Sequence, residues 1–193
     1  MKYFLILIAL LFLVFIVIQL FAMKSQKNIE TYSYKVNKKY DTFEIRNYEA
    51  SLFTSVKLSG NEYKEVSSKG FSILAGYIFG GNDKNEKISM TSPVSMSLED
   101  STTMMFMVPK KISKDKLPKP NQSQIEFREE PAKMVAAISF GGWANDEKIE
   151  KYKNLLKASL DLEGITYSSR FYFLGYNAPY EAFNRKNEII VEL

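Results

Sequence analysis

The chemistry open to this chain is limited at the outset, because its 193 residues include no histidine and no cysteine. A Ser-His-Asp or Cys-His arrangement cannot form within it, and neither can an ordinary Cys/His zinc site. General acid–base work would fall to carboxylates, Lys or Tyr. The paired carboxylates Glu129–Glu130 and Glu147/Glu150 lack the apolar surroundings that raise a carboxyl pKa, so we interpret them as surface charge. We expect no catalytic residue, no metal site and no enzymatic activity.

Three tyrosines near the C-terminus, Tyr172, Tyr176 and Tyr180, recur at a spacing of four residues. A phenolic oxygen can ligate ferric iron, so Tyr176 or Tyr180 is the best oxygen ligand that the chain offers. The three rings could equally line a cavity. Ordinary packing is the default interpretation of each.

The stretch GGNDKNEKISMTSPV, residues 80–94, superficially resembles a phosphate-binding loop. It lacks the G-x-x-x-x-G-K-[ST] spacing, so we interpret it as a helix stop and turn followed by a strand, with Pro93 at a bulge or edge. The net charge of +4 is not a strong indication of a nucleic-acid-binding surface. The basic run KKISKDKLPKP is interrupted by Asp115 and prolines and reads as a solvated loop. We therefore expect no nucleic-acid partner.

The N-terminal residues 3–23 are apolar except for Gln19. At about 1.5 Å per residue this segment reaches roughly 30 Å, the thickness of a bilayer's hydrocarbon core. Only Leu20-Phe21-Ala22 resembles a cleavage site, which favours a retained anchor over residues 1–23, with a cleaved signal as the alternative. The early position of the segment indicates an extracytoplasmic domain, whereas lysines on both sides leave the membrane orientation open. The polar, lysine-rich residues 24–39 read as a linker to a domain at 40–193.

The domain shows the same order of elements twice, strand–strand–helix–strand–strand, with a Gly/Asn turn before each helix. Hydrophobic alternation and helical spacing predict these elements. The predicted ranges are 40–48, 52–58, helix 62–78, 88–98 and 102–108, then 125–130, 134–140, helix 146–162, 167–176 and 188–193. We infer an α+β domain of two similar halves: a mostly antiparallel sheet with one helix from each half packed on it.

The first helix carries more apolar surface than one stripe requires. Its core stripe comprises Tyr63, Val66, Gly70, Ile73, Leu74 and Tyr77. A second stripe, Phe71, Ala75 and Ile78, lies on an adjacent face. Packing against two neighbours explains this width, and the wall of a ligand site is the sharper alternative.

Four stretches in order, YDTFEIRNYEASLFTSV, FSILAGYIFGGNDKNEKISMTSPVSM, FREEPAKMVAAISFGGWA and FLGYNAPYEAFNRKNEI, resemble the SOUL haem-binding protein family. The resemblance covers roughly residues 40–193. It implies a distorted antiparallel β-barrel with two helices and a pseudo-two-fold, here preceded by a transmembrane helix. It also implies non-covalent binding of haem or another tetrapyrrole. Similar folds occur in bacterial effector-sensing domains that bind bulky apolar cations.

The resemblance places haem in an apolar groove beside the first helix and the loop before the last strand. The implied site residues are Phe71, Leu74, Ala75, Ile78, Tyr176, Tyr180 and Arg185. Where animal relatives place basic side chains near the haem propionates, this chain has Gly76 and Glu181. Arg185 and Lys186 are then the nearest remaining cations by sequence, and a rim ion pair with Glu188 or another surface carboxylate is their alternative role.

We therefore predict a membrane-tethered module that holds a small amphipathic ligand, a tetrapyrrole such as haem, mainly by hydrophobic contacts without His or Cys ligation. One alternative, which Glu181 favours, is a sensor or sequestering module for bulky apolar cations. The other alternative is an interaction module that has no ligand.

Overall fold

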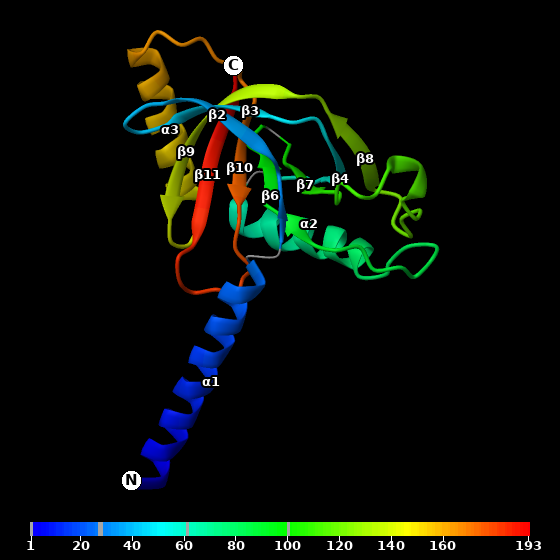
Figure 1. Ribbon diagram of the computed structural model, residues 1–193, viewed down its shortest axis with the longest axis vertical. Coiled ribbons are helices and arrows are strands. Elements are labelled where there is room, and N and C mark those ends of the chain that lie inside the picture. The colour runs from blue at the N-terminus through cyan, green and yellow to red at the C-terminus, as the bar shows by residue number, and fades with distance from the viewer. Residues whose placement is uncertain (1, 27–28, 61, 100) are drawn as a thin grey trace.

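The computed structural model describes residues 2–26, 29–60, 62–99 and 101–193 of the chain. A long N-terminal helix, α1 (Lys2–Gln26), projects from one end of an α+β domain (Figure 1). The domain's helices are α2 (Tyr63–Ile78), α3 (Asp146–Leu162) and a 3-10 turn, η1 (Lys114–Lys116). Its strands are β1 (Glu30–Thr31), β2 (Tyr34–Lys39), β3 (Glu44–Tyr48), β4 (Ser51–Lys57), β5 (Thr91–Ser92), β6 (Val94–Ser97), β7 (Thr103–Met107), β8 (Ile125–Glu130), β9 (Lys133–Gly141), β10 (Phe171–Gly175) and β11 (Lys186–Glu192).

Nine strands form one curled antiparallel sheet in the order β2-β3-β9-β11-β10-β6-β7-β4-β8. The order shows the predicted repeat, because β6 of the first half pairs with β10 of the second at the centre of the sheet. On each side, a strand of one half pairs with a strand of the other. Strand β3 of the first half pairs with β9 of the second, and β8 of the second half pairs with β4 of the first. The two halves therefore exchange their first strands about a pseudo-two-fold axis, which confirms the predicted α+β fold.

The segment expected to be a linker contains two strands: β2 joins the large sheet, and β1 belongs to a separate two-stranded sheet. Strand β2 pairs with β3, and β1 pairs in parallel with β5. All of β2 after Tyr34 is exposed, so its lysine-rich sequence carries no alternation of buried and exposed residues. It is held by backbone hydrogen bonds at an edge of the sheet, where lysines discourage pairing with other chains. The prediction that 24–39 is only a tether is thus wrong for these two strands.

Helices α2 and α3 cover one face of the sheet (Figure 1). Val66 and Leu74 of α2, and Leu156 and Leu160 of α3, are at most 1% exposed. Each such burial stabilises the fold by about 1.5–3 kcal/mol. The predicted turn before α3 supplies Asn145, whose side chain accepts a hydrogen bond from the Lys148 amide. The corresponding cap predicted at position 61 lies outside the described residues.

The starts of the two helices meet, because the Tyr63 amide of α2 donates to Asp146 Oδ1 of α3 over 2.6 Å. An acidic side chain is favourable at a helix N-terminus, where unpaired amides give partial positive charge. This contact joins the two halves of the repeat, and it brings the turn before α3 close to α2.

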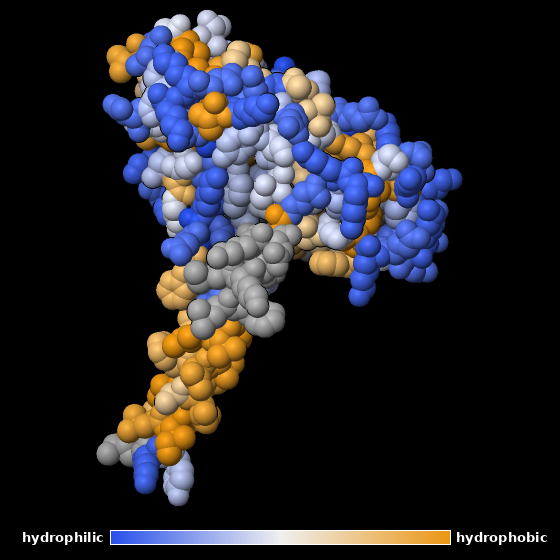
Figure 2. Space-filling view, in the orientation of Figure 1, coloured by the Kyte–Doolittle hydropathy of each residue, from blue (hydrophilic) through white to orange (hydrophobic). Residues whose placement is uncertain are grey.

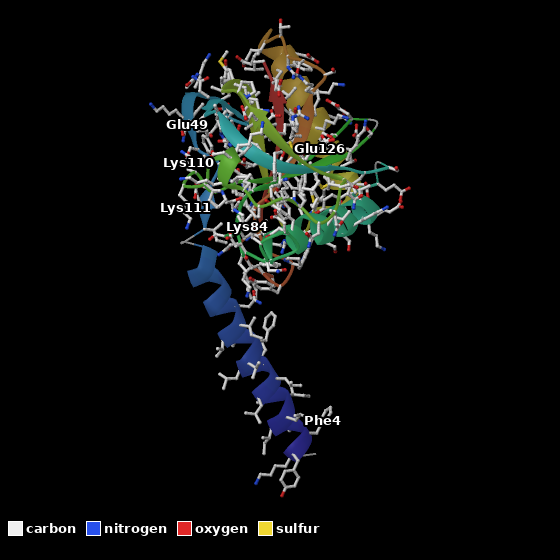
Figure 3. The ribbon with its side chains drawn as sticks, turned by 90° about the vertical axis from the view of Figure 1, so that its right-hand side faces the viewer. Phe4, Glu49, Lys84, Lys110, Lys111 and Glu126 are labelled. Atoms are coloured by element: carbon white, nitrogen blue, oxygen red, sulfur yellow. The ribbon has the colours of Figure 1, made fainter. Side chains whose placement is uncertain are left out.

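The surface of α1 differs from that of the domain. Residues 2–19 have a mean hydropathy of 2.6, and 6% of these residues are buried. The helix is therefore long and apolar enough to cross a membrane. A signal sequence would pass the same test. The face of α1 that Figure 2 shows is mainly apolar, whereas charged groups are frequent on the face of the domain in the same view. Phe4 lies near the N-terminal end of the helix, far from the domain (Figure 3).

The lysine-rich run after β7 lies on the surface, as predicted. Its five lysines are all exposed. Lys110 forms an ion pair with Glu49 at 2.7 Å, and the two side chains lie together on one side of the domain (Figure 3). Exposed pairs of this kind contribute little to stability.

Candidate functional site

Two adjoining hollows lie between α2, the sheet and the loop that joins β10 to β11. The first has a volume of about 490 Å³ and is lined on one side by Phe79, Met90 and the loop residues 176–181. The second, of about 430 Å³, is lined by aromatic side chains and Arg185. The residues common to both are Phe71, Val94, Gly175, Asn177 and Pro179. Each volume falls in the range of about 300–1,000 Å³ that is typical of small-molecule sites.

Of the four predicted helix residues, Phe71 alone reaches these hollows. It is half-buried, and its ring centroid lies 5.3 Å from that of Phe106. Leu74, Ala75 and Ile78 are 0%, 8% and 4% exposed and belong to the core between the helices and the sheet. The curled sheet wraps round α2 and covers Leu74, Ala75 and Ile78, whereas Phe71 stays partly uncovered. These three residues therefore support the wall from behind, whereas the prediction placed them on it.

The loop between β10 and β11 is tied together by its own polar groups. The Glu181 carboxylate accepts hydrogen bonds from Asn177 Nδ2 (2.7 Å) and from the Ala178 amide (3.1 Å). Asn177 Oδ1 in turn accepts from the amide of Lys186, the first residue of β11. Glu181, predicted to stand where animal relatives place a basic side chain, is 6% exposed and helps to hold the loop.

Arg185 closes the second hollow from the loop side. Its guanidinium carbon lies 3.9 Å from the ring centroid of Trp143, in the turn before α3. Its Nη1 donates to the carbonyl oxygen of Ala178 (2.9 Å), and its buried Nε has no partner among the described residues. Burial lowers the pKa of Arg185 from its ordinary value. Of the two predicted cations, Lys186 forms the ion pair with Glu188, at 3.0 Å, and Glu188 is buried.

Tyr176 and Tyr180 occupy different environments within the first hollow. The Tyr176 hydroxyl donates to Glu188 Oε2 over 2.6 Å, and burial, followed by the Glu188 charge, raises its pKa well above the ordinary value. A phenolate ligand to iron at this position would require that proton to leave beside a carboxylate. Tyr180, by contrast, is 61% exposed at the outer part of the loop.

Beneath this loop lies a buried ion pair that the sequence did not predict. Glu188 is 0% exposed, and both of its oxygens accept from Arg46 Nη1 at 3.0 Å. Ser139 Oγ adds a hydrogen bond of 2.8 Å. Burial alone would raise the pKa of Glu188, but the hydrogen bonds and charge of Arg46 outweigh it and hold that pKa below its usual value. Through Tyr176, this pair fixes the start of the loop to the sheet.

The fold and the hollows define a curled half-barrel domain with an apolar groove beside its first helix. The family model described as "SOUL heme-binding protein" matches residues 29–192. The chain therefore belongs to the SOUL haem-binding protein family. The match starts at residue 29, in agreement with the strands found before residue 40.

Curated relatives agree with this membership. The chain is 30% identical to "Heme-binding protein 2" of Mus musculus over 158 residues, which is 77% of this chain and 76% of the relative. It is 28% identical to "Heme-binding protein 1" of Xenopus laevis over 156 residues, covering 76% and 81% of the two chains.

Solved structures support the fold alone. The EcmrR C-terminal domain aligns with a TM-score of 0.62 at 10% identity, covering 82% of this chain and 96% of that domain. A protein described as a hydrolase from Listeria innocua aligns with a TM-score of 0.54 at 11% identity, covering 80% and 93%. Within the described part of the chain, no group of three or more Asp, Glu, His or Cys side chains is arranged to hold a metal ion.

Proposed function

We propose that this protein is a membrane-tethered module that binds a tetrapyrrole such as haem, non-covalently, in the groove beside α2. The observation that carries the proposal is the position of Phe71, which forms a wall common to two adjoining hollows. A flat, largely apolar ligand could extend past this ring from one hollow into the other. The relatives named as haem-binding proteins support the choice of ligand class.

The chemistry of the lining fits such a ligand. Tyr63, Trp143 and Phe173 line the second hollow together with Phe71, and aromatic faces pack well against a flat ring system. The buried Nε of Arg185 offers an unused donor to a carboxylate at the edge of the ligand. Tyr176 and Tyr180 would form the loop-side wall.

The iron of a bound haem would receive little help from this chain. The sequence supplies neither His nor Cys, and the Tyr176 hydroxyl is engaged with Glu188. Met90 and Tyr180 also line the first hollow and carry atoms that can ligate iron. Burial of apolar surface is therefore the main source of affinity in this proposal. The tether would be α1, retained in the membrane.

A haem titration of the full chain tests this proposal. Phe71→Glu places a charge on the wall common to both hollows, and we expect it to abolish the saturable Soret shift. The matched control is Leu162→Glu, which makes the same change at a side chain that is 86% exposed at the end of α3. Saturable one-to-one binding that survives Phe71→Glu would refute the site.

A second titration separates the edge contact from the apolar contact. Arg185→Gln should weaken binding of haem, whose propionates are charged, and leave binding of its dimethyl ester unchanged. Equal losses for both ligands would show that Arg185 does not contact the carboxylates.

The two alternatives are less well supported by the geometry. A cation-binding groove would use Trp143 and Glu181, but the guanidinium of Arg185 already covers the Trp143 ring, and Glu181 bonds within its own loop. A ligand-free interaction module would fill the groove with its own side chains, whereas hollows of about 490 and 430 Å³ are present.

A further inference from the structure

Helix α1 contacts the same loop that lines the first hollow. Gln19 is the one polar residue of the apolar segment 3–23. Its Nε2 donates to the carbonyl oxygen of Tyr180, and its Oε1 accepts from the amide of Ala182, both at 2.9 Å. The side chain is 6% exposed. An amide that would be costly in an apolar helix is thus satisfied by two backbone groups of the β10–β11 loop.

A second contact lies one turn further towards the N-terminus of α1. The rings of Phe15 and Phe183 meet edge to face with centroids 6.2 Å apart. Four residues of helix correspond to about 6 Å along the axis, so Phe183 lies beside the part of α1 that precedes Gln19. Residues 2–19 form the window long and apolar enough to span a membrane. If α1 spans a bilayer, Phe183 reaches below the polar surface of that bilayer.

The rim of the first hollow lies at the same end of the domain as these contacts with α1. The loop lies at the end of the domain from which α1 extends (Figure 1). Tyr180 and Phe79 line the first hollow and are 61% and 63% exposed, and Phe183 in the same loop is 58% exposed. Tyr180 suits the membrane interface, where an amphipathic ring is favoured, and the exposed phenyl rings of Phe79 and Phe183 suit its apolar side.

We propose that the β10–β11 loop is seated in the membrane interface by Gln19 and Phe183, so that the first hollow opens at the surface of the lipid bilayer. An amphipathic ligand dissolved in the membrane then enters the groove from the lipid instead of from bulk water. Gln19 is a positioning residue, because it holds the loop to the anchor and does not line the hollow. The choice of ligand rests on the proposed tetrapyrrole function, but the seating of the loop does not.

The seating is tested by the depth of a tryptophan in the full chain reconstituted into phosphatidylcholine vesicles. The single native tryptophan is first removed as Trp143→Phe. Phe183→Trp and Leu162→Trp are then compared, since both native side chains are exposed apolar groups. We expect lipids with brominated acyl chains to quench the Phe183→Trp protein and aqueous iodide to quench the Leu162→Trp protein. Iodide quenching of both, without lipid quenching of Phe183→Trp, overturns the proposal. So does protection of Phe183→Trp from both quenchers, which would indicate a contact with a second copy of the chain.

The role of Gln19 is tested by Gln19→Leu, which keeps the helix apolar and removes both hydrogen bonds. In the Phe183→Trp, Trp143→Phe background we expect a loss of lipid quenching. In the native background we expect slower Soret change when haem is pre-dissolved in the bilayer, with little change when haem is delivered from albumin in water. Unchanged quenching and unchanged kinetics overturn the positioning role. Lipid quenching at position 183 without any Soret change refutes the tetrapyrrole function and supports the seating of the loop.

Discussion

Replacement of Glu188 by Gln should destabilise the protein strongly, because it removes one partner of a buried ion pair. Glu188 is 0% exposed and Arg46 is 3% exposed. The carboxylate accepts from Arg46, Ser139, Tyr176 and Lys186, all within 3.0 Å. The side-chain amide of Gln keeps one acceptor oxygen but has an NH2 group in place of the other. That donor would then face partners that are themselves donors.

The expected cost lies towards the lower end of about 3–5 kcal/mol in the free energy of unfolding, the usual effect of breaking a buried ion pair, because Arg46 keeps a second partner in Glu44 at 2.9 Å. For a chain of 150–250 residues, each kcal/mol lowers Tm by roughly 2–4 °C, so the expected fall is about 6–20 °C. The loop should loosen as well, because the Tyr176 hydroxyl loses its charged acceptor.

The pH dependence follows from the direction of the Glu188 pKa shift. The folded-state pKa lies below the usual value, because Arg46 outweighs the effect of burial. An ordinary Glu in the unfolded chain has a pKa of about 4.3. The contribution of Glu188 to stability is therefore fully present above about pH 4.3 and is lost as pH falls through the lower folded pKa. Glu188→Gln should flatten the stability profile below that pH and lower the plateau at neutral pH.

Thermal unfolding of the full chain in detergent, followed by near-ultraviolet circular dichroism between pH 3 and pH 8, measures both effects. The matched control is Glu129→Gln, because Glu129 pairs with Lys114 at the surface with 68% of its side chain exposed. That pair should contribute little. If Glu188→Gln shifts Tm no more than Glu129→Gln does, the buried pair is not what holds this part of the sheet.

Two further predictions use the same unfolding assay. Gly70→Ala should cost about 1–3 kcal/mol, since the added methyl group would lie 2.6 Å from Leu58 Cδ1, whereas Gly76→Ala should stabilise α2 by up to about 1 kcal/mol, since the nearest atom beyond its chain neighbours and the helix's own backbone lies 4.0 Å away. Equal signs for the two glycines would contradict the observed packing of α2. Tyr176→Phe should cost about 1.5–3 kcal/mol by removing the hydrogen bond to Glu188, yet leave the spectrum of bound ferric haem unchanged. A changed ligand-field spectrum would instead identify the Tyr176 oxygen as an iron ligand.

Much of the architecture followed from local patterns along the chain. The 3.6-residue spacing of apolar side chains predicted α2 and α3, and alternation predicted most strands of the repeat to within a few residues. Strand β2 was not predicted, because an exposed edge strand has no buried face that would require alternating apolar and polar residues. The predicted strand at residues 40–48 begins only at Glu44, because residues 40–43 form the turn between β2 and β3, in which the Tyr40 amide donates to the Phe43 carbonyl oxygen over 2.8 Å.

The candidate site was predicted only in part. The sequence identified Phe71 and the loop before the last strand, both of which line the hollows. It could not distinguish Phe71 from Leu74 and Ile78, because all three lie on apolar stripes of one helix, and the way the sheet curls round α2 decides which of them is covered.

By itself, then, the sequence determined most of the elements, their twofold repetition and the membership of the family, since these depend on short-range periodicity and on motifs. It also excluded His and Cys chemistry by composition. Only the tertiary structure paired Arg46 with Glu188, 142 residues apart, and joined Gln19 to a loop more than 160 residues away. In each contact a polar side chain binds a partner that lies far along the chain, and no local sequence pattern indicates that partner. They form because a polar group that is buried without a specific partner carries a large desolvation cost.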